Sequence, residues 1–318
     1  MKRGADGQTL SAEPDSPMAL KDARLPLEKA HPHGRDLCIT FEPEKHKYTV
    51  TRDGVAEEAP VSVTSFAKRY FKSFDATAVI DKNYDKWKSD TGSKYYSLIH
   101  ATLSTGASED HAKFAIANLW SSKAEKASHE GTSMHSDAEF LLNGLEVADS
   151  KEMQLLRKWR KEFQPHMKWV PERTEWKLWW EDARCDGAVL VAGTLDLLMR
   201  SETTDEYALV DFKRTNPAPK YTGGPPNLLG PHQGAKFHPG YADAPLGELE
   251  NNDFGKYTMQ LNILAIMLQE KYGIVVKNTF LLQMHPGLDE AHCVQVPGHM
   301  NATDSLFTIE AERLRQSL

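Results

Sequence analysis

The feature that most constrains the fold of this chain is a series of three apolar runs between residues 172 and 215. The runs read RTEWKLWW, AVLVAGTLDLLMR and EYALVDFKRT, and short polar segments at residues 181–187 and 201–205 separate them. Runs of this length, rich in aliphatic and aromatic residues and joined by short turns, are typical of neighbouring antiparallel strands. The sequence therefore predicts a three-strand antiparallel meander.

Helical patterns flank this meander on both sides. Residues 112–144 are helical in pattern, and a second helix is expected from Asp149, which would form a capping box with Glu152. After the meander come an apolar helix, KYTMQLNILAIMLQEKY, that stops at Gly273, two short strands, and a final helix at residues 303–316. The order helix, three strands, helix, strand predicts an α/β fold with a central mixed β-sheet flanked by helices.

The chain divides into three predicted regions. Residues 1–36 mix charged residues, Pro and Gly without an apolar pattern, so we expect a flexible N-terminal tail. Residues 37–126 are expected to form a mostly helical accessory region that begins with a short strand or hairpin. Residues 127–318 would form the core, with a Pro- and Gly-rich loop insertion at residues 216–255.

The composition restricts the class of protein. A net charge of −7, from 38 basic and 45 acidic residues, does not indicate a protein that coats long duplexes by charge alone. The three cysteines are far apart and form no C-x-x-C pair, so the chain cannot hold an iron–sulfur cluster on four thiolates. The absence of a long apolar run predicts no membrane span and no signal peptide, and hence an intracellular location, cytoplasmic or nuclear.

The second and third runs carry the residues best suited to chemistry. Because side chains alternate along a strand, Asp211 and Lys213 should share one face while Phe212 points to the other. The turn at residues 201–205 can bring Asp196 beside Asp211. Two carboxylates on adjacent strands, with the backbone carbonyl of Phe212, would form an oxygen site suited to one or two Mg²⁺ or Mn²⁺ ions. Lys213 could orient or activate an attacking water.

Residues outside this strand pair could complete the site. His135 lies four residues before Glu139 on one helical face, so it is either a metal ligand whose ring Glu139 orients or a packed or surface histidine. Glu175 is an alternative carboxylate, although an exposed strand residue is the preferred interpretation. Gln260, on the apolar helix, is either a hydrogen-bonded core residue or a contact to the site.

Four short motifs, in this order along the chain, resemble the PD-(D/E)XK nuclease superfamily in its RecB-type branch, which includes many exonucleases. EGTSMHSDAE resembles the helical Gly-x-x-x-His motif of that branch, GTLD its G-x-x-D motif, VDFK its D-x-K motif, and YTMQLNIL its Q-L-x-x-Y motif. A weaker likeness, over residues 41–290, extends to proteins of this branch carried by large DNA viruses and some microbes. One position departs from the pattern, because Leu264 stands where the helix motif has Tyr.

The resemblance implies a restriction-endonuclease-like core and a metal-dependent nuclease that hydrolyses DNA phosphodiester bonds, as an exonuclease more than as an endonuclease. His135, Asp196 and Asp211 would hold Mg²⁺ or Mn²⁺, Lys213 would orient the water, and Gln260 would organise the site or contact the nucleotide. The implied partner is DNA, with free ends or single-stranded, in repair or recombination.

Two other functions are compatible with the same residues. One is a catalytically inactive nucleic-acid-binding protein with a nuclease fold, and the other is a metal-dependent hydrolase of another phosphate ester. Lys220 and Tyr221, in the long loop, are expected substrate contacts. The lysine-rich stretch at residues 68–94 is either a solvated helical face or a nucleic-acid-binding rim. On such a rim, Tyr70, Phe71 or Trp87 would stack with bases.

Overall fold

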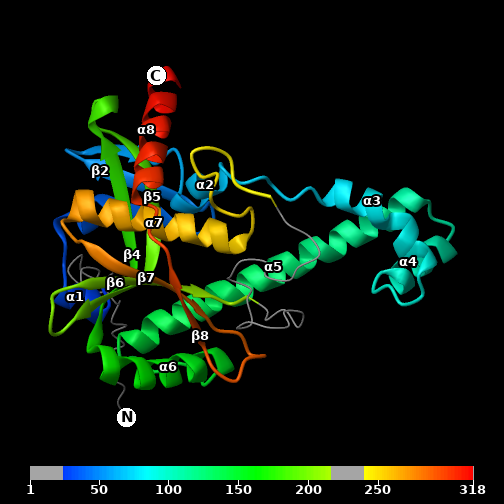
Figure 1. Ribbon diagram of the computed structural model, residues 1–318, viewed down its shortest axis with the longest axis horizontal. Helices are drawn as coiled ribbons and strands as arrows, with labels where there is room; N and C mark the ends of the chain where they lie inside the picture. The colour runs from blue at the N-terminus through cyan, green and yellow to red at the C-terminus, as the bar shows by residue number, and fades with distance from the viewer. Residues whose placement is uncertain (1–23, 216–239, 318) are drawn as a thin grey trace, which may run out of the picture.

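The computed structural model describes residues 24–215 and 240–317 of the chain. Its centre is a five-stranded sheet in the order β4-β5-β6-β7-β8 (Figure 1). The first three strands form an antiparallel meander, β7 lies parallel to β6, and β8 is antiparallel to β7. The predicted meander and mixed sheet are therefore confirmed. The strands are β4 (Trp169–Asp182), β5 (Ala188–Ser201), β6 (Tyr207–Lys213), β7 (Val276–Gln283) and β8 (His292–Val296).

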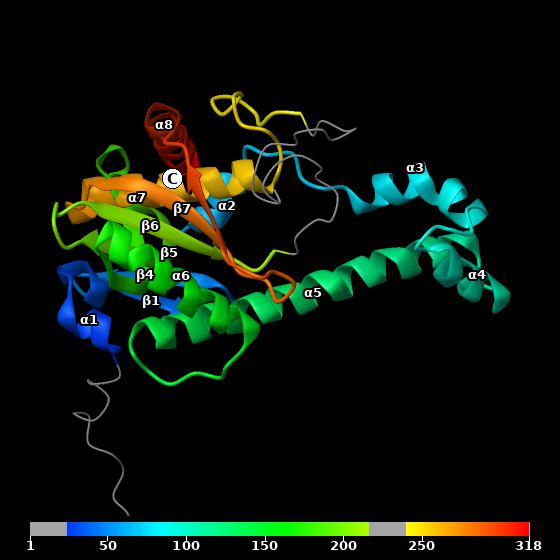
Figure 2. The same cartoon turned by 60° about the horizontal axis from the view of Figure 1, so that its bottom comes forward.

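Helices cover both faces of this sheet. On one side lie α6 (Lys151–Met167) and the C-terminal part of α5 (Glu109–Leu142), and on the other lie α7 (Asp253–Tyr272) and α8 (Met300–Ser317), as Figure 2 shows. One buried apolar cluster lies beneath α5 and α6, and a larger one lies beneath α7 and α8. The described chain is thus an α/β protein with a helical layer on each face of the sheet.

The ends of α7 follow from polar and glycine residues at its boundaries. The side chain of Asn252 accepts a hydrogen bond from the N–H of Gly255 at 2.8 Å, which caps the first turn. A Cβ at position 255 would collide with the backbone carbonyl of Glu250, so only glycine fits there. The helix ends at Gly273 in the left-handed conformation, with φ of 70°, as the sequence predicted.

The start of α6 differs from the prediction. The Oγ of Ser150 accepts the N–H of Met153 at 3.2 Å, so the expected capping box of Asp149 and Glu152 is wrong. Glu152 instead pairs with Arg214, at 2.7 Å, just beyond the end of β6. This ion pair ties α6 to the strand that carries the candidate catalytic residues.

A smaller antiparallel sheet packs against β4 and β5. It consists of β1 (Ile39–Glu42), β2 (Lys47–Arg52) and β3 (Val55–Glu58). Val50 of this sheet and Trp179 of β4 belong to the apolar cluster that joins the two sheets. The predicted accessory region therefore begins with a three-stranded sheet, one strand more than a hairpin.

The helix α2 (Val63–Lys68) lies close against β5 because residue 193 is glycine. A Cβ at Gly193 would fall 2.5 Å from Cγ2 of Val63, so a larger residue would push the helix away from the strand. Gly193 begins the GTLD segment that carries Asp196. The glycine of that motif thus has a packing role in this fold.

Part of the segment expected to be a flexible tail is ordered. Residues 24–36 pack on the core, and α1 (Pro26–Ala30) lies within them. The carboxylate of Asp36 accepts hydrogen bonds from Arg173 at 2.9 Å and from the indole N–H of Trp176 at 2.6 Å. The expectation of a flexible tail over residues 1–36 is therefore wrong for residues 24–36, because their partners lie about 140 residues further along the chain; residues 1–23 lie outside the described part.

A helical arm stands off from the sheet in both Figure 1 and Figure 2. It consists of α3 (Ala76–Ser89), α4 (Tyr96–Ser104) and the N-terminal part of α5, which enclose an apolar cluster of their own. Residues 121–129 of α5 are exposed on every side, and the helix runs through them into the core. The expected boundary at residue 126 therefore lies inside one continuous helix.

The three aromatic residues of the alternative nucleic-acid-binding rim do not lie together on the surface. Tyr70 and Phe71 are buried in the core cluster beneath α7, and Trp87 packs against Tyr95 in the arm, with ring centroids 4.4 Å apart. Burial removes Tyr70 and Phe71 from contact with a ligand, and Trp87 is half-buried against the arm cluster, which favours the solvated-face interpretation of the lysine-rich stretch.

The expected loop insertion at residues 216–255 is only partly described. Residues 240–252 form turns with a bridge between Tyr241 and Glu250, and Leu246 and Leu249 are buried in the core cluster beneath α7. Residues 216–239, including Lys220 and Tyr221, lie outside the described residues. Within the described ranges, no helix combines the length and the apolar character needed to cross a bilayer.

Candidate metal centre

Three carboxylates lie in a row across neighbouring strands of the large sheet. The pairs Thr174–Leu197 and Trp176–Leu195 on either side place Glu175 near Asp196. Continuation of the register beyond the pair Leu197–Val210 places Asp196 near Asp211. The backbone N–H of Phe212 donates a hydrogen bond to Oδ2 of Asp196 at 2.6 Å. The turn between β5 and β6 thus brings Asp196 beside Asp211, as the sequence predicted.

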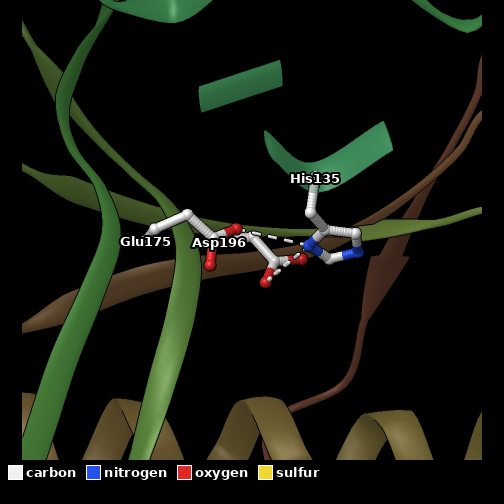
Figure 3. A group of neighbouring side chains, drawn as sticks. All are labelled: His135, Glu175 and Asp196. Carbon is white, nitrogen blue, oxygen red and sulfur yellow. Dashed lines mark hydrogen bonds and ion pairs between the residues drawn. The ribbon is translucent and has the colours of Figure 1, made fainter. Parts of the chain in front are cut away.

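His135 reaches this row from α5. Its Nδ1 lies 3.3 Å from Oε1 of Glu175 and 3.4 Å from Oδ1 of Asp196. Figure 3 shows the two carboxylates converging from neighbouring strands on this ring nitrogen. One ligand atom from each of the three residues lies within 4.8 Å of the others, close enough for a single metal ion to bridge them.

Glu175 is a member of this group, so its preferred interpretation as an exposed strand residue is wrong. Only 26% of its side-chain surface is exposed. Its φ of 42° lies in the left-handed region, within a strand that is otherwise extended. A non-glycine residue adopts this conformation only where its surroundings impose it, and such residues cluster at functional sites.

Glu139 does not orient the imidazole in the way expected. The hydrogen bond of His135 goes to Glu175. Glu139 lines a polar cavity of about 120 Å³ together with Glu175 and Lys177. Burial, and then the charge of Glu175, raises the pKa of Glu139 to about 7. The expected orienting contact with His135 is therefore wrong, while an auxiliary place for Glu139 near the site stays a prediction.

Asp211 and Lys213 form the second part of the site. The Nζ of Lys213 lies 2.5 Å from Oδ2 of Asp211, and Nε2 of Gln260 donates a hydrogen bond to Oδ1 of Asp211 at 3.3 Å. Phe212 points away, into the cluster beneath α5 and α6. The predicted alternation is thus confirmed, and Gln260 contacts Asp211, while its role at a catalytic site stays a prediction.

Tyr257 also contacts Lys213, although the sequence pattern did not single it out. The Nζ of Lys213 lies 4.4 Å from the centroid of the Tyr257 ring. Tyr257 is three residues before Gln260, so both side chains project from the same face of α7. The spacing of these two residues was a signal that could have identified Tyr257 once Gln260 was assigned to the site.

The pKa values of the carboxylates are shifted in different directions. Burial raises the pKa of Asp211 to about 6, with Asp196 adding to the rise and Lys213 opposing it. Burial also acts to raise the pKa of Asp196, but His135 and Lys213 hold it below its usual value. Asp196 is consequently the carboxylate most firmly held as an anion.

The same charges act on the imidazole. Burial acts to lower the pKa of His135, but Asp196 and Glu175 raise it well above its usual value. Burial raises the pKa of Glu175, opposed by the hydrogen bond with His135. Without a metal ion, a protonated His135 balances the neighbouring acids, and a divalent cation would have to displace that proton.

The side chains of His135, Glu175 and Asp196 could together hold a divalent cation. Carboxylate oxygens suit Mg²⁺ and Mn²⁺, whereas an imidazole nitrogen suits several transition metals, so the choice of Mg²⁺ or Mn²⁺ stays a prediction. Oδ2 of Asp211 is buried, and the partner that the described residues give it is the Lys213 ammonium. Asp211 is not in the His135, Glu175 and Asp196 group, so its role as a ligand stays a prediction, as does that of the Phe212 carbonyl.

Comparison with known proteins adds no assignment. No family model matches the chain, and no curated protein matches it. Among solved structures, the chain is similar to the one described as the crystal structure of SSO0001, with a TM-score of 0.27 and 12% identity over 73% of this chain and 83% of that one. A likeness at this level supports no conclusion about function.

Proposed function

We propose that this protein is a divalent-metal-dependent nuclease that hydrolyses DNA phosphodiester bonds, as an exonuclease more than as an endonuclease. The observation that carries the proposal is the convergence of His135, Glu175 and Asp196 beside the Asp211–Lys213 pair. The preference for exonuclease activity rests on the resemblance of the four sequence motifs to the RecB-type branch.

In this proposal, each side chain has a distinct task. His135, Glu175 and Asp196 would hold the metal, with Asp211 as a further ligand. A divalent ion at this place supplies positive charge that polarises a phosphate oxygen and favours ionisation of water. Lys213 orients the attacking water and offsets charge on the phosphate, and Gln260 holds the Asp211 carboxylate in place.

The test is incubation with end-labelled linear, circular and single-stranded DNA in Mg²⁺, Mn²⁺ or chelator. We expect metal-dependent degradation of linear DNA, and a loss of at least about 100-fold in Asp211→Ala and Lys213→Ala, because removal of one preorganised charged group at a reacting phosphate has effects of this order. Asp289→Ala, at an exposed acid in the connection between β7 and β8, is the matched control and should retain full activity.

Two outcomes would contradict this proposal. Cleavage that is absent under every metal, or equal in wild type and Asp211→Ala, excludes nuclease activity at this site. DNA binding without cleavage would favour an inactive binding protein. Rapid hydrolysis of a small phosphodiester such as bis(p-nitrophenyl) phosphate, with DNA left intact, would favour a hydrolase of another phosphate ester.

A further inference from the structure

Lys213 needs a defined position for its proposed role, and its own side chain does not provide one. An ammonium group on a four-carbon stem is flexible and is held only by its partners. Two partners are present in the described structure, the Asp211 carboxylate at 2.5 Å and the face of the Tyr257 ring at 4.4 Å from its centroid. The second distance lies in the range at which an aromatic face attracts a cation.

Tyr257 is fixed on the same element as the partner of Asp211. It lies in the first turns of α7, two residues after Gly255, a position where a Cβ would collide with the Glu250 carbonyl. The ring packs partly against the core cluster beneath α7. One face of α7 therefore presents a ring to Lys213 and an amide, from Gln260, to Asp211.

The two partners of Lys213 are not equivalent during metal binding. If Asp211 serves as a metal ligand, its carboxylate is shared and its attraction for Lys213 weakens. The Tyr257 ring remains as a partner and keeps the ammonium within the site. Loss of the ring would leave Lys213, only 14% of whose side chain is exposed, without a defined position.

We propose that Tyr257 is a positioning residue that holds the Lys213 ammonium through its ring face, an inference that rests on the proposed nuclease function. The position of the Tyr257 ring can be compared with residue 264, where this sequence departs from the resembling motif. The resembling motif has Tyr four residues after the Gln, but here that position is Leu264, which is buried in the core at 1% exposure. This chain instead places an aromatic ring one turn before Gln260.

The kinetic test separates the ring from the hydroxyl. Tyr257→Phe and Tyr257→Trp keep an aromatic face and should retain at least half of the wild-type kcat. Tyr257→Leu removes the face and should lower kcat by about 3- to 30-fold, the range that corresponds to a cation–π interaction, with KM within about twofold. In a Lys213→Met background, Tyr257→Leu should have no further effect, because its partner is absent. Full kcat in Tyr257→Leu, equal losses in Phe and Leu variants, or additive effects with Lys213→Met would overturn the inference.

A second measurement distinguishes failure of this inference from failure of the proposed function. An aromatic ring this close should shift the Cε protons of Lys213 upfield in NMR spectra, assigned by their loss in Lys213→Arg. The shift should persist in Tyr257→Phe and disappear in Tyr257→Leu. If wild type shows no nuclease activity, the proposed function fails, and the NMR shift alone decides whether Tyr257 positions Lys213. Absence of the shift in wild type overturns the inference.

Discussion

At the scale of single residues, the site shows how position changes what a carboxylate can do. Glu175, Asp196 and Asp211 lie side by side on one sheet, but their partners differ: His135 for the first two, and Lys213 with Gln260 for the third. We therefore make one prediction for each group: the first concerns metal affinity, and the second concerns how the free energy of unfolding depends on pH.

Substitution of Glu175 should weaken metal binding. We expect Glu175→Gln to lower the affinity for Mn²⁺ by at least about tenfold, because it removes a charged oxygen ligand from the group with His135 and Asp196. Glu146→Gln, at an exposed acid in the α5–α6 connection, should bind as wild type. Isothermal titration calorimetry in a metal-free buffer measures both. Equal affinities in all three proteins would exclude Glu175 from the site.

The raised pKa of Asp211 should make the metal-free protein less stable as pH rises. Its pKa is about 6 in the fold against an ordinary value of 3.8, so its contribution to stability is full below about pH 4 and is lost as pH rises through 6. Between pH 4 and 7.5, wild type should lose more free energy of unfolding than Asp211→Asn, by on the order of 2 kcal/mol. Urea unfolding in the presence of chelator measures the difference. Parallel pH curves for the two proteins would contradict it.

At the scale of elements, the helical arm has an apolar cluster of its own, separate from the clusters of the sheet. Its aromatic and aliphatic cluster makes no use of the sheet, and residues 121–129 of α5 connect it to the core without side-chain burial. A helix that is polar on every side for more than two turns is typical of a connection between two packed bodies. The arm should therefore unfold separately from the sheet.

A charge in the centre of the arm tests this independence. Ile99 is fully buried in the arm cluster, and Ile99→Asp should unfold the arm because an unpaired buried carboxylate costs several kcal/mol. Hydrogen exchange should show lost protection at residues 76–120 and retained protection in β5 and β6. Ala101→Asp, at an exposed position of the same helix, is the control and should change neither. Global unfolding by Ile99→Asp would show instead that the arm and the sheet form one cooperative unit.

At the scale of the whole molecule, the N-terminal segment joins parts that are distant in the sequence. Arg35 lies over the ring of Trp179, 3.4 Å from its centroid, and pairs with Glu181 at 2.6 Å. Asp36 pairs with Arg173, and both side chains are almost completely buried. This segment thus covers the outer part of β4, the edge strand of the large sheet.

Removal of this segment should destabilise the entire fold. A chain that begins at Leu37 loses the Arg173–Asp36 and Arg35–Glu181 ion pairs together with the packing of Arg35 on Trp179, so it should unfold at a lower temperature than the full chain. A chain that begins at Arg24 keeps both pairs and should match the full chain. Thermal unfolding of the three proteins is the measurement. If the chain beginning at Leu37 unfolds at the temperature of the full chain, these contacts contribute nothing to stability.

Much of the architecture could be predicted from local pattern alone. The alternation in Asp211-Phe212-Lys213, the short turn that returns Asp196 to its neighbour, and the stop at Gly273 are each set by a few consecutive residues. Such features depend on backbone geometry and on short connections. They are therefore readable without the rest of the molecule, and the α/β order of the core followed from them.

The remaining features depended on contacts between distant residues. Glu175 joins His135 because β4 pairs with β5 and because its backbone adopts a positive φ, which no local pattern signals. Tyr257 meets Lys213 because α7 packs on β6. Thus the sequence by itself determined the strand that carries Asp211 and Lys213 and the carboxylate beside it. Only the tertiary structure decided which side chains complete the site, because strand pairing and helix packing bring together residues tens of positions apart.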